Sequence, residues 1–269
     1  MFLAAAVQLT STSDERASME AAEALIRRAA GHGATLIATP EATNYLGPHA
    51  EKVRRAEPLD GSVCQRFSVL AASLGVHLML GSFNERSDDP DRCHNTSVLF
   101  GPDGRIIRAY RKIHLFDVDV SDQVRFFESD TVVAGTEPVV ARTALADVGM
   151  SVCYDLRFPE LYRRLVAQGA TVLTVPSAFT LTTGKDHWEV LLRSRAIESQ
   201  SYVIAPGQVG EHDDGGLRQS WGHSMIVDPW GHVVGMSADG PGLALAEIDL
   251  DRVQRIRAGM PVTAHRRFP

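Results

Sequence analysis

The sequence predicts an α/β protein in which a mixed β-sheet is covered by helices in layers. Short apolar runs typical of buried strands alternate with segments of helical periodicity along the chain. Turn signals such as Gly101-Pro102-Asp103-Gly104 join neighbouring strand-like runs and add antiparallel hairpins. No linker rich in Pro, Gly or Ser divides the 269 residues, so one domain over 1–269 is expected. Together these features favour a layered mixed sheet.

The first half of the chain is expected to contribute five strands and two helices. Strands are predicted over residues 2–9, 34–39, 76–83, 94–100 and 105–112. Helices are predicted over residues 14–30 and 61–74. Ser13 is the predicted N-cap of the first helix, which ends at Gly31, and Gly75 ends the second.

The second half continues the alternation. Strands are predicted over residues 148–153, 170–178, 201–207, 224–235 with a turn at Pro229-Trp230-Gly231, and 242–250. Helices are predicted over 159–168 and 186–200, the latter from apolar residues at helical spacing. Residues 210–219 are expected to form a surface loop, and the tail from about residue 260 has no helix or strand pattern.

Composition excludes several functional classes. A net charge of −6 provides no basic field for a nucleic-acid partner. Three cysteines without a CxxC pair predict neither a disulfide framework nor a metal site, and they suit a reducing cytoplasm. The apolar start lacks a basic signal-peptide region, and no run has the length of a membrane helix. We therefore expect a cytoplasmic protein with no membrane or nucleic-acid partner.

Cys153 stands where a predicted strand ends and a turn begins. The run from Val148 to Cys153 is apolar, and the next predicted helix begins at Pro159. A cysteine at such a junction projects its sulfur over the carboxyl edge of a sheet, near backbone N–H groups that the turn leaves unpaired. An acyl-transfer nucleophile is effective in that position.

Three charged residues are expected near the same edge. Glu41 follows the predicted strand 34–39, Lys112 ends the second strand of the hairpin, and Glu128 lies in the loop RFFESD. A free thiol has a pKa of about 8.5. A carboxylate such as Glu41 can therefore accept its proton, pass it to a leaving amine and later activate water. Lys112 favours the thiolate and, with the N–H of Tyr154, stabilises an oxyanion.

Each of these residues also has a simpler interpretation. A lone strand cysteine usually packs as a small hydrophobic residue, and a lone Glu or Lys at a strand end is usually solvated. Spacing alone does not decide between the two. A non-catalytic interaction protein, which needs none of these groups, is the alternative from another class. A cysteine protease is disfavoured, because no motif places a His–Asn pair to serve Cys153.

Three segments carry a resemblance to a known family. ATPEATNYLG, YRKIHLFDVDV and SVCYDLRFPELYRR resemble the nitrilase superfamily of carbon–nitrogen hydrolases, in an order that fits almost the whole chain. The resemblance implies a four-layer αββα sandwich without a cofactor. It implies that Glu41 is the general base, Lys112 the oxyanion stabiliser and Cys153 the nucleophile. Glu128 falls where many members carry a second, positioning Glu.

The resemblance narrows the expected substrate. CYDLRFPEL and the ending PVTAHRRF are similar to the branch that contains omega-amidases and deaminated glutathione amidases. The implied substrate is an amide beside a carboxylate-bearing 2-oxo acyl group. Deaminated glutathione is expected first, 2-oxoglutaramate or 2-oxosuccinamate is the alternative, and N-carbamoyl compounds are a third possibility. The branch also implies a homodimer or higher homo-oligomer, with Leu161, Tyr162 and Leu165 at the contact and the tail from about residue 260 lying on the partner.

Four further residues are candidates for substrate binding. Arg157 supplies a guanidinium for an anionic substrate, although a pair with Asp155 or Glu160 would explain it equally well. Phe179 and Thr182 lie on a loop expected near the site and are candidates to line the acyl pocket. His187, at a predicted helix start, either contacts substrate or, as that position favours, holds a loop in place. Of the remaining cysteines, Cys64 is expected in the core and Cys93 in an exposed polar loop.

Overall fold

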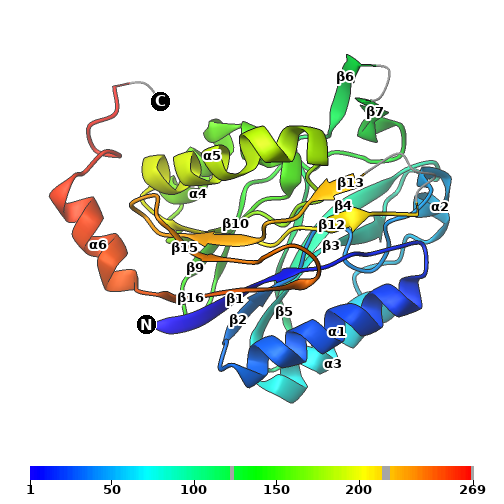
Figure 1. The fold of residues 1–269 in the computed structure, drawn as a ribbon, viewed down its shortest axis with the longest axis horizontal. Helices are drawn as coiled ribbons and strands as arrows, with labels where there is room; N and C mark the ends of the chain where they lie inside the picture. Colours follow the sequence, from blue (N-terminus) through cyan, green and yellow to red (C-terminus); the bar gives the residue numbers. More distant parts are fainter. Residues whose placement is uncertain (122–123, 214–218, 268–269) are drawn as a thin grey trace.

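The protein consists of two six-stranded β-sheets packed face to face, with helices on both outer faces (Figure 1). The computed structural model describes residues 1–121, 124–213 and 219–267. Strand order is β16-β1-β2-β3-β4-β5 in the first sheet and β15-β14-β11-β10-β9-β8 in the second. The predicted four-layer αββα sandwich is therefore confirmed.

The two sheets are built alike. The first contains β1 (Phe2–Gln8), β2 (Leu36–Ala38), β3 (His77–Arg86), β4 (Cys93–Phe100), β5 (Ile106–Arg111) and β16 (Gly242–Ile248). The second contains β8 (Val139–Arg142), β9 (Asp147–Met150), β10 (Val172–Thr174), β11 (Tyr202–Ala205), β14 (Met225–Val227) and β15 (Val233–Met236). Three parallel strands, β1-β2-β3 and β9-β10-β11, form the centre of each sheet, and antiparallel strands flank them.

Four helices form the outer layers. α1 (Glu15–Gly31) and α3 (Ser62–Leu74) pack on the first sheet, and α4 (Pro159–Ala167) and α5 (Leu181–Ser199) on the second. Apolar side chains between the two sheets and under α4 and α5 form one core, and those under α1 and α3 form another. Burial of these faces is the main favourable term that holds the layers together.

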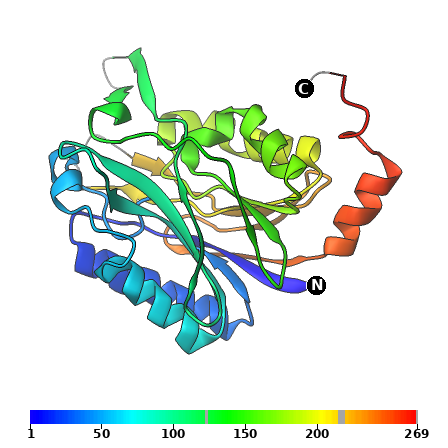
Figure 2. The same ribbon diagram turned by 180° about the vertical axis from the view of Figure 1, so that it is seen from behind.

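Smaller elements surround the sandwich. They are α2 (His49–Arg54), α6 (Leu250–Gly259), the 3₁₀ turns η1 (Glu128–Asp130) and η2 (Cys153–Arg157), and the hairpins β6 (Asp117–Ser121)–β7 (Val124–Phe127) and β12 (Val209–Glu211)–β13 (Gln219–Trp221). The β6–β7 hairpin and α6 lie at opposite ends of the molecule in both views (Figure 2). No helix in the described ranges is long and apolar enough to cross a membrane.

Several predicted elements differ from the structure. Asp14, not Ser13, caps α1, because Ser13 is engaged by Asp213 while the Asp14 side chain accepts a hydrogen bond from Ala17 N–H. The predicted loop 210–219 has strands at its described ends, and its residues 214–218 lie outside the described ranges. Helix α5 begins at Leu181, five residues before the predicted start at residue 186.

Burial corrects two further expectations. Leu161, Tyr162 and Leu165 are 3%, 0% and 0% exposed and pack inward under α4, so they cannot form the contact with a second subunit. Cys93, expected in an exposed loop, is fully buried because it begins β4. Cys64 lies in the core, as predicted.

Strand ends position the candidate site. Glu41 lies three residues beyond β2, Lys112 directly follows β5, and Cys153 lies three residues beyond β9. Gly81 lets β3 approach the segment before Glu41, because a Cβ there would lie 1.9 Å from the Thr39 carbonyl oxygen and 2.2 Å from that of Pro40. Any side chain at this position would push away the backbone that carries Glu41.

Candidate active site

Cys153 occupies a strained turn between β9 and α4. Its φ angle of 51° lies in the left-handed region that non-glycine residues rarely adopt. The Cys153 N–H donates to the Pro176 carbonyl at 2.9 Å. Within the described ranges no such bond is found for the next N–H, that of Tyr154, which lies in the first turn of η2 where helix amides lack internal partners. The turn therefore presents both a thiol and a hydrogen-bond donor.

The Asp155 carboxylate fixes this turn. It is fully buried and accepts hydrogen bonds from Val152 N–H at 2.8 Å and from the Tyr110 hydroxyl at 2.7 Å. Its other oxygen accepts from the backbone N–H of His114 at 3.0 Å and lies 2.7 Å from the ring nitrogen Nδ1 of that residue. Since His114 is two residues from Lys112, one carboxylate ties the nucleophile turn to the segment that carries the lysine.

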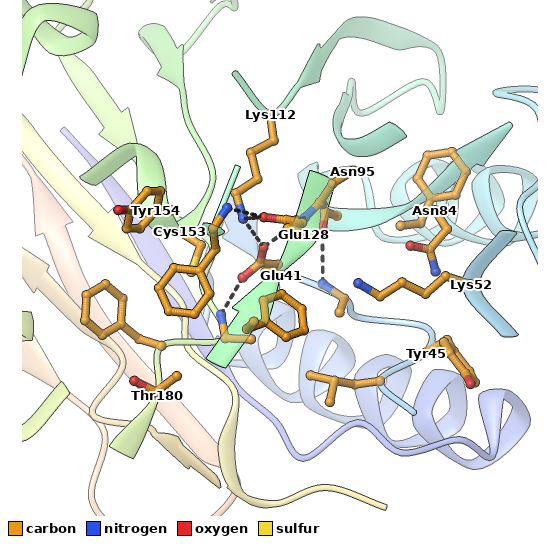
Figure 3. A pocket seen from close by; sticks show the side chains of 18 of the residues that line it. Glu41, Tyr45, Lys52, Asn84, Asn95, Lys112, Glu128, Cys153, Tyr154 and Thr180 are labelled. Atoms are coloured by element: carbon orange, nitrogen blue, oxygen red, sulfur yellow. Dashed lines mark hydrogen bonds and ion pairs between the residues drawn. The ribbon is translucent and has the colours of Figure 1, made fainter. Parts of the chain in front are cut away.

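Four buried side chains form a closed hydrogen-bonded ring beside Cys153 (Figure 3). Lys112 Nζ lies 3.0 Å from Glu41 Oε1 and 2.8 Å from Glu128 Oε2. Opposite the lysine, Asn95 Nδ2 donates to Glu41 Oε1 at 2.9 Å and to Glu128 Oε1 at 3.1 Å. Backbone donors fix both carboxylates further, because Ala178 N–H donates to Glu41 Oε2 and Phe116 N–H donates to Glu128 Oε2, both at 2.8 Å.

Charge pairing sets the ionisation of this ring. Burial opposes ionisation of Glu128, but the ammonium of Lys112 outweighs it and lowers the pKa of Glu128 to about 2. Burial likewise opposes the charge on Lys112, but Glu128 and Glu41 raise its pKa well above the usual value. Glu128 and Lys112 are therefore both charged at neutral pH.

The Cys153 side chain rests as a thiol. Burial raises the pKa of Cys153 well above its ordinary value, the Glu41 carboxylate raises it further, and Lys112 opposes them without prevailing. A thiol of this kind becomes a nucleophile only if a base removes its proton as it attacks. The carboxylate beside the thiol is that of Glu41, which acts on the Cys153 pKa both through its charge and through a side-chain hydrogen bond.

The ring lies at the floor of a cavity with about 740 Å³ of empty space, part of it open to solvent. Arg157, Phe179, Thr180 and Thr183 border the cavity on the α5 side. Of the residues expected to bind substrate, Arg157 and Phe179 therefore line the cavity. Thr182 and His187 are exposed on α5 and do not line it.

Arg157 has no carboxylate partner in the described part of the chain, so the expected alternative of a pair with Asp155 or Glu160 is not what the structure shows. Its guanidinium lies over the rings of Tyr154 and Phe179, and its Nη1 is 3.3 Å from His187 Nδ1. Thr182 was predicted to border the cavity, but Thr180 and Thr183 line it instead. The reason is that α5 begins at Leu181, so Thr182 lies on the exposed face of the helix.

Asn95 and Lys52 are among the polar residues of this site that sequence reasoning missed. Asn95 lies in a fully buried strand, and Lys52 lines the cavity from the six-residue helix α2. A signal for Asn95 was available, since an asparagine within a predicted buried strand needs hydrogen-bond partners. No group of three His, Cys, Asp or Glu side chains suited to a metal ion occurs within residues 1–121, 124–213 and 219–267.

Comparisons with known proteins agree with this geometry. The family model for carbon–nitrogen hydrolases matches residues 3–258. Deaminated glutathione amidase from Synechocystis sp. is 43% identical over 270 residues, which cover 99% of this chain and 98% of that protein. The Homo sapiens protein of the same name is 43% identical over 272 residues, covering 98% and 82%.

Solved structures show the same fold. The crystal structure of the C. elegans NitFhit protein superposes with a TM-score of 0.92 at 39% identity over 99% of this chain, which spans 65% of that longer protein. Saccharomyces cerevisiae Nit3, a member of branch 10 of the nitrilase superfamily, superposes with a TM-score of 0.88 at 32% identity, covering 99% and 97%. The chain thus belongs to the carbon–nitrogen hydrolase family of the nitrilase superfamily, and it is a hydrolase of carbon–nitrogen bonds other than peptide bonds.

Proposed function

We propose that this protein hydrolyses deaminated glutathione to 2-oxoglutarate and cysteinylglycine through a thioester on Cys153. The observation that carries the proposal is the position of a buried thiol against a carboxylate that is itself fixed by an ammonium and an amide. Relatives named deaminated glutathione amidase match nearly all of this chain, and their name is the reason for choosing this substrate.

Acylation uses the groups around the thiol. Glu41 takes the Cys153 proton while the sulfur attacks the amide carbon and forms a C–S bond. The oxyanion accepts hydrogen bonds from Lys112 Nζ and from the Tyr154 N–H, which the turn holds ready. Glu41 then passes its proton to the leaving nitrogen, the C–N bond breaks and cysteinylglycine departs. Throughout, Glu128 keeps Lys112 charged and in place.

Deacylation repeats these steps with water. Glu41 removes a proton from a water molecule, whose oxygen attacks the thioester carbon against the same oxyanion donors. The C–S bond breaks, the proton passes from Glu41 to the sulfur, and 2-oxoglutarate leaves. No cofactor or metal enters either step, because the thiol, carboxylate and ammonium carry every transfer.

Alternative substrates use the same chemistry. An omega-amidase acting on 2-oxoglutaramate or 2-oxosuccinamate would need the 2-oxo acid site but little room for a leaving group. An N-carbamoyl hydrolase is a further alternative. A non-catalytic interaction protein would not need the thiol, carboxylate and ammonium as a set. Ranking deaminated glutathione, the two 2-oxo amides and a carbamoyl compound by kcat/KM decides among these, and a higher rank for 2-oxoglutaramate would overturn the proposed substrate.

Two variants test the proposed roles. Lys112→Ala should lower kcat by about 10²–10³ if Lys112 stabilises the oxyanion. Glu41→Gln keeps the size of the side chain but cannot accept a proton, so acylation should stop and no thioester should accumulate. A raised KM at unchanged kcat in either variant would show that the residue only binds substrate.

A cytoplasmic homodimer is part of the same proposal. Three unpaired thiols suit a reducing compartment. With Leu161, Tyr162 and Leu165 buried, exposed apolar residues offer a different contact: Val190 and Ile197 on α5 are 64% and 47% exposed, and Trp230 is 52% exposed. Sedimentation at micromolar concentration tests this assembly, and a monomer there would contradict it.

A further inference from the structure

A second lysine lines the cavity from the side opposite the nucleophile turn. The chain contains only three lysines, Lys52, Lys112 and Lys185, among its 27 basic residues. Two of these, Lys52 and Lys112, line the cavity. Lys112 forms ion pairs with Glu41 and Glu128 in the ring. Lys52 belongs to α2, and its side chain is half-buried.

The cavity is flanked by a cation on each side of the carboxylate ring. In Figure 3, Tyr154 and Thr180 lie on one side of Glu41, and Lys52, Asn84 and Tyr45 lie on the other. Arg157 belongs to the first side, since its guanidinium lies over the Tyr154 ring. Lys52 belongs to the second, with its ammonium 6.0 Å from the centre of the Phe126 ring. A bound substrate that passes Cys153 therefore runs between two cations.

The balance of charge in the cavity favours anions. Among the described residues, three basic side chains line it, namely Lys52, Lys112 and Arg157, against two acidic ones, Glu41 and Glu128. Both carboxylates already accept hydrogen bonds from Lys112. With Cys153 as a neutral thiol, the lining contributed by the described residues is net positive, although the protein carries a net charge of −6. A local field of this sign attracts anionic ligands into the cavity.

The direction of the leaving group follows from the proposed chemistry. The oxyanion lies against the Tyr154 N–H and Lys112, and the leaving nitrogen must meet Glu41 to receive its proton. Ala42 directly follows Glu41, and its N–H donates to Ser82 Oγ at 2.8 Å. Ala42 and Ser82 line the cavity together with Lys52. The amine half of the substrate thus extends toward Lys52.

We propose that Lys52 binds a carboxylate on the amine side of the scissile bond, so that the preferred substrate carries a carboxylate on each side of that bond. This inference rests on the proposed function and deepens it. It separates deaminated glutathione, whose leaving group ends in a glycine carboxylate, from the small 2-oxo amides, which release ammonia. An ammonium–carboxylate contact made in the cavity contributes to kcat/KM through binding of the leaving group.

The charge of Lys52 also affects the ionisation of Glu128 in the ring. The test must distinguish this electrostatic effect from direct binding of a substrate carboxylate. Burial raises the pKa of Glu128, while Lys112 first and Lys52 second lower it. A purely electrostatic or structural role of Lys52 would therefore affect every substrate alike and would change the pH profile. Binding of one carboxylate affects only substrates that carry it.

Three substrates distinguish these roles: deaminated glutathione, its C-terminal glycinamide, and 2-oxoglutaramate. The wild-type protein should lose on the order of 10–100-fold in kcat/KM when the glycine carboxylate is replaced by the amide, as for a charged hydrogen bond. Lys52→Met should lose a similar factor on deaminated glutathione and almost nothing on the other two, with an unchanged pH profile. Lys185→Met is the matched control, because Lys185 is exposed on α5 outside the cavity lining.

Two outcomes would overturn the inference. Equal losses on all three substrates would assign Lys52 to the ring or the fold. A loss on 2-oxoglutaramate as large as that on deaminated glutathione would place Lys52 at the acyl side instead.

A binding measurement tests the role of Lys52 independently of whether the protein hydrolyses deaminated glutathione. In a Cys153→Ala background, calorimetry with deaminated glutathione and its glycinamide should show a preference for the free carboxylate that Lys52→Met removes. If the wild type hydrolyses neither compound, the proposed function fails, and this measurement still decides on Lys52. The absence of any preference in the Cys153→Ala background would contradict the role of Lys52.

Discussion

The ammonium of Lys112 lies 2.8 Å from Glu128 Oε2 in a pair that is almost completely buried, with side-chain exposures of 2% and 4%. Removing two such charges from water is costly, and their attraction offsets that cost only when the geometry is good and the remaining polar atoms are satisfied. Both conditions hold, because Asn95 and the Phe116 N–H complete the coordination of Glu128. The pair therefore stabilises the folded protein only while Glu128 is ionised.

The first prediction concerns acid stability. The pKa of Glu128 is lowered to about 2 from an ordinary 4.5, so its contribution to folding is present above the ordinary value and is lost as pH falls toward 2. Glu128→Gln lacks this contribution. The difference in unfolding free energy between wild type and Glu128→Gln should shrink by about 2 kcal/mol from pH 7 to pH 3. Urea unfolding at both pH values measures it, and a constant difference would show that Glu128 is not held ionised.

The second prediction concerns the thiols. Cys153→Ala should abolish turnover while the fold is retained, because no other thiol faces the carboxylate ring within the described residues. Cys64→Ala and Cys93→Ala are the controls, since both residues are buried and neither lines the cavity. They should keep kcat and lose only stability. Alkylation in the presence and absence of substrate gives a second reading, and labelling of Cys153 that substrate does not slow would contradict its role.

The third prediction concerns Asn95 as a positioning residue. Asn95→Ala removes the donor shared by Glu41 and Glu128, so both carboxylates gain freedom to leave the catalytic geometry. We expect kcat to fall on the order of 10–100-fold at nearly unchanged KM, as for loss of a hydrogen bond to a charged group. Asn95→Asp should be more severe, because it places a third carboxylate beside two others.

Asn44→Ala is the matched control for this prediction. Asn44 is also buried and also donates to a carboxylate, that of Glu15 at 2.7 Å, but it lies outside the cavity lining. Its loss should lower the melting temperature without lowering kcat. An equal loss of kcat in both variants would mean that Asn95 acts through overall stability alone.

Local sequence patterns predicted the strands and thereby the strand ends that carry the site. Glu41, Lys112 and Cys153 follow β2, β5 and β9. Apolar runs indicated β2 and β9, and the turn signal Gly101-Pro102-Asp103-Gly104 indicated β5 as the second strand of a hairpin. The turn after Cys153 and the helix that begins at Pro159 were also predicted correctly from their own segments.

Contacts between residues that are far apart in the sequence could not be predicted from local patterns. Asn95 meets Glu128 across 33 positions and Glu41 across 54, and no local pattern reports such contacts. Helix α2 contains no fully buried residue, so it has no apolar periodicity to reveal Lys52. Cys93 was misplaced for the same reason, because the polar residues around it suggested a loop while pairing between β3 and β4 buries it.

The last prediction concerns Arg157 and the acyl side of the substrate. Its guanidinium lines the cavity over the rings of Tyr154 and Phe179, and the described residues offer it no carboxylate. A substrate carboxylate is therefore the partner we expect. Arg157→Met should lose about 1.5–3 kcal/mol in transition-state stabilisation on 2-oxoglutaramate, but far less on a neutral amide of similar size.

Methionine keeps an apolar chain against the two rings, so the substitution removes the charge with little loss of packing. His187→Ala is the accompanying control. It removes the ring nitrogen 3.3 Å from Arg157 Nη1 and leaves the guanidinium present, so it should change the preference between the two substrates only slightly. If Arg157→Met slows both substrates by the same factor, Arg157 serves only the turn between Cys153 and α4. In that case the acyl carboxylate is bound by another group in the cavity.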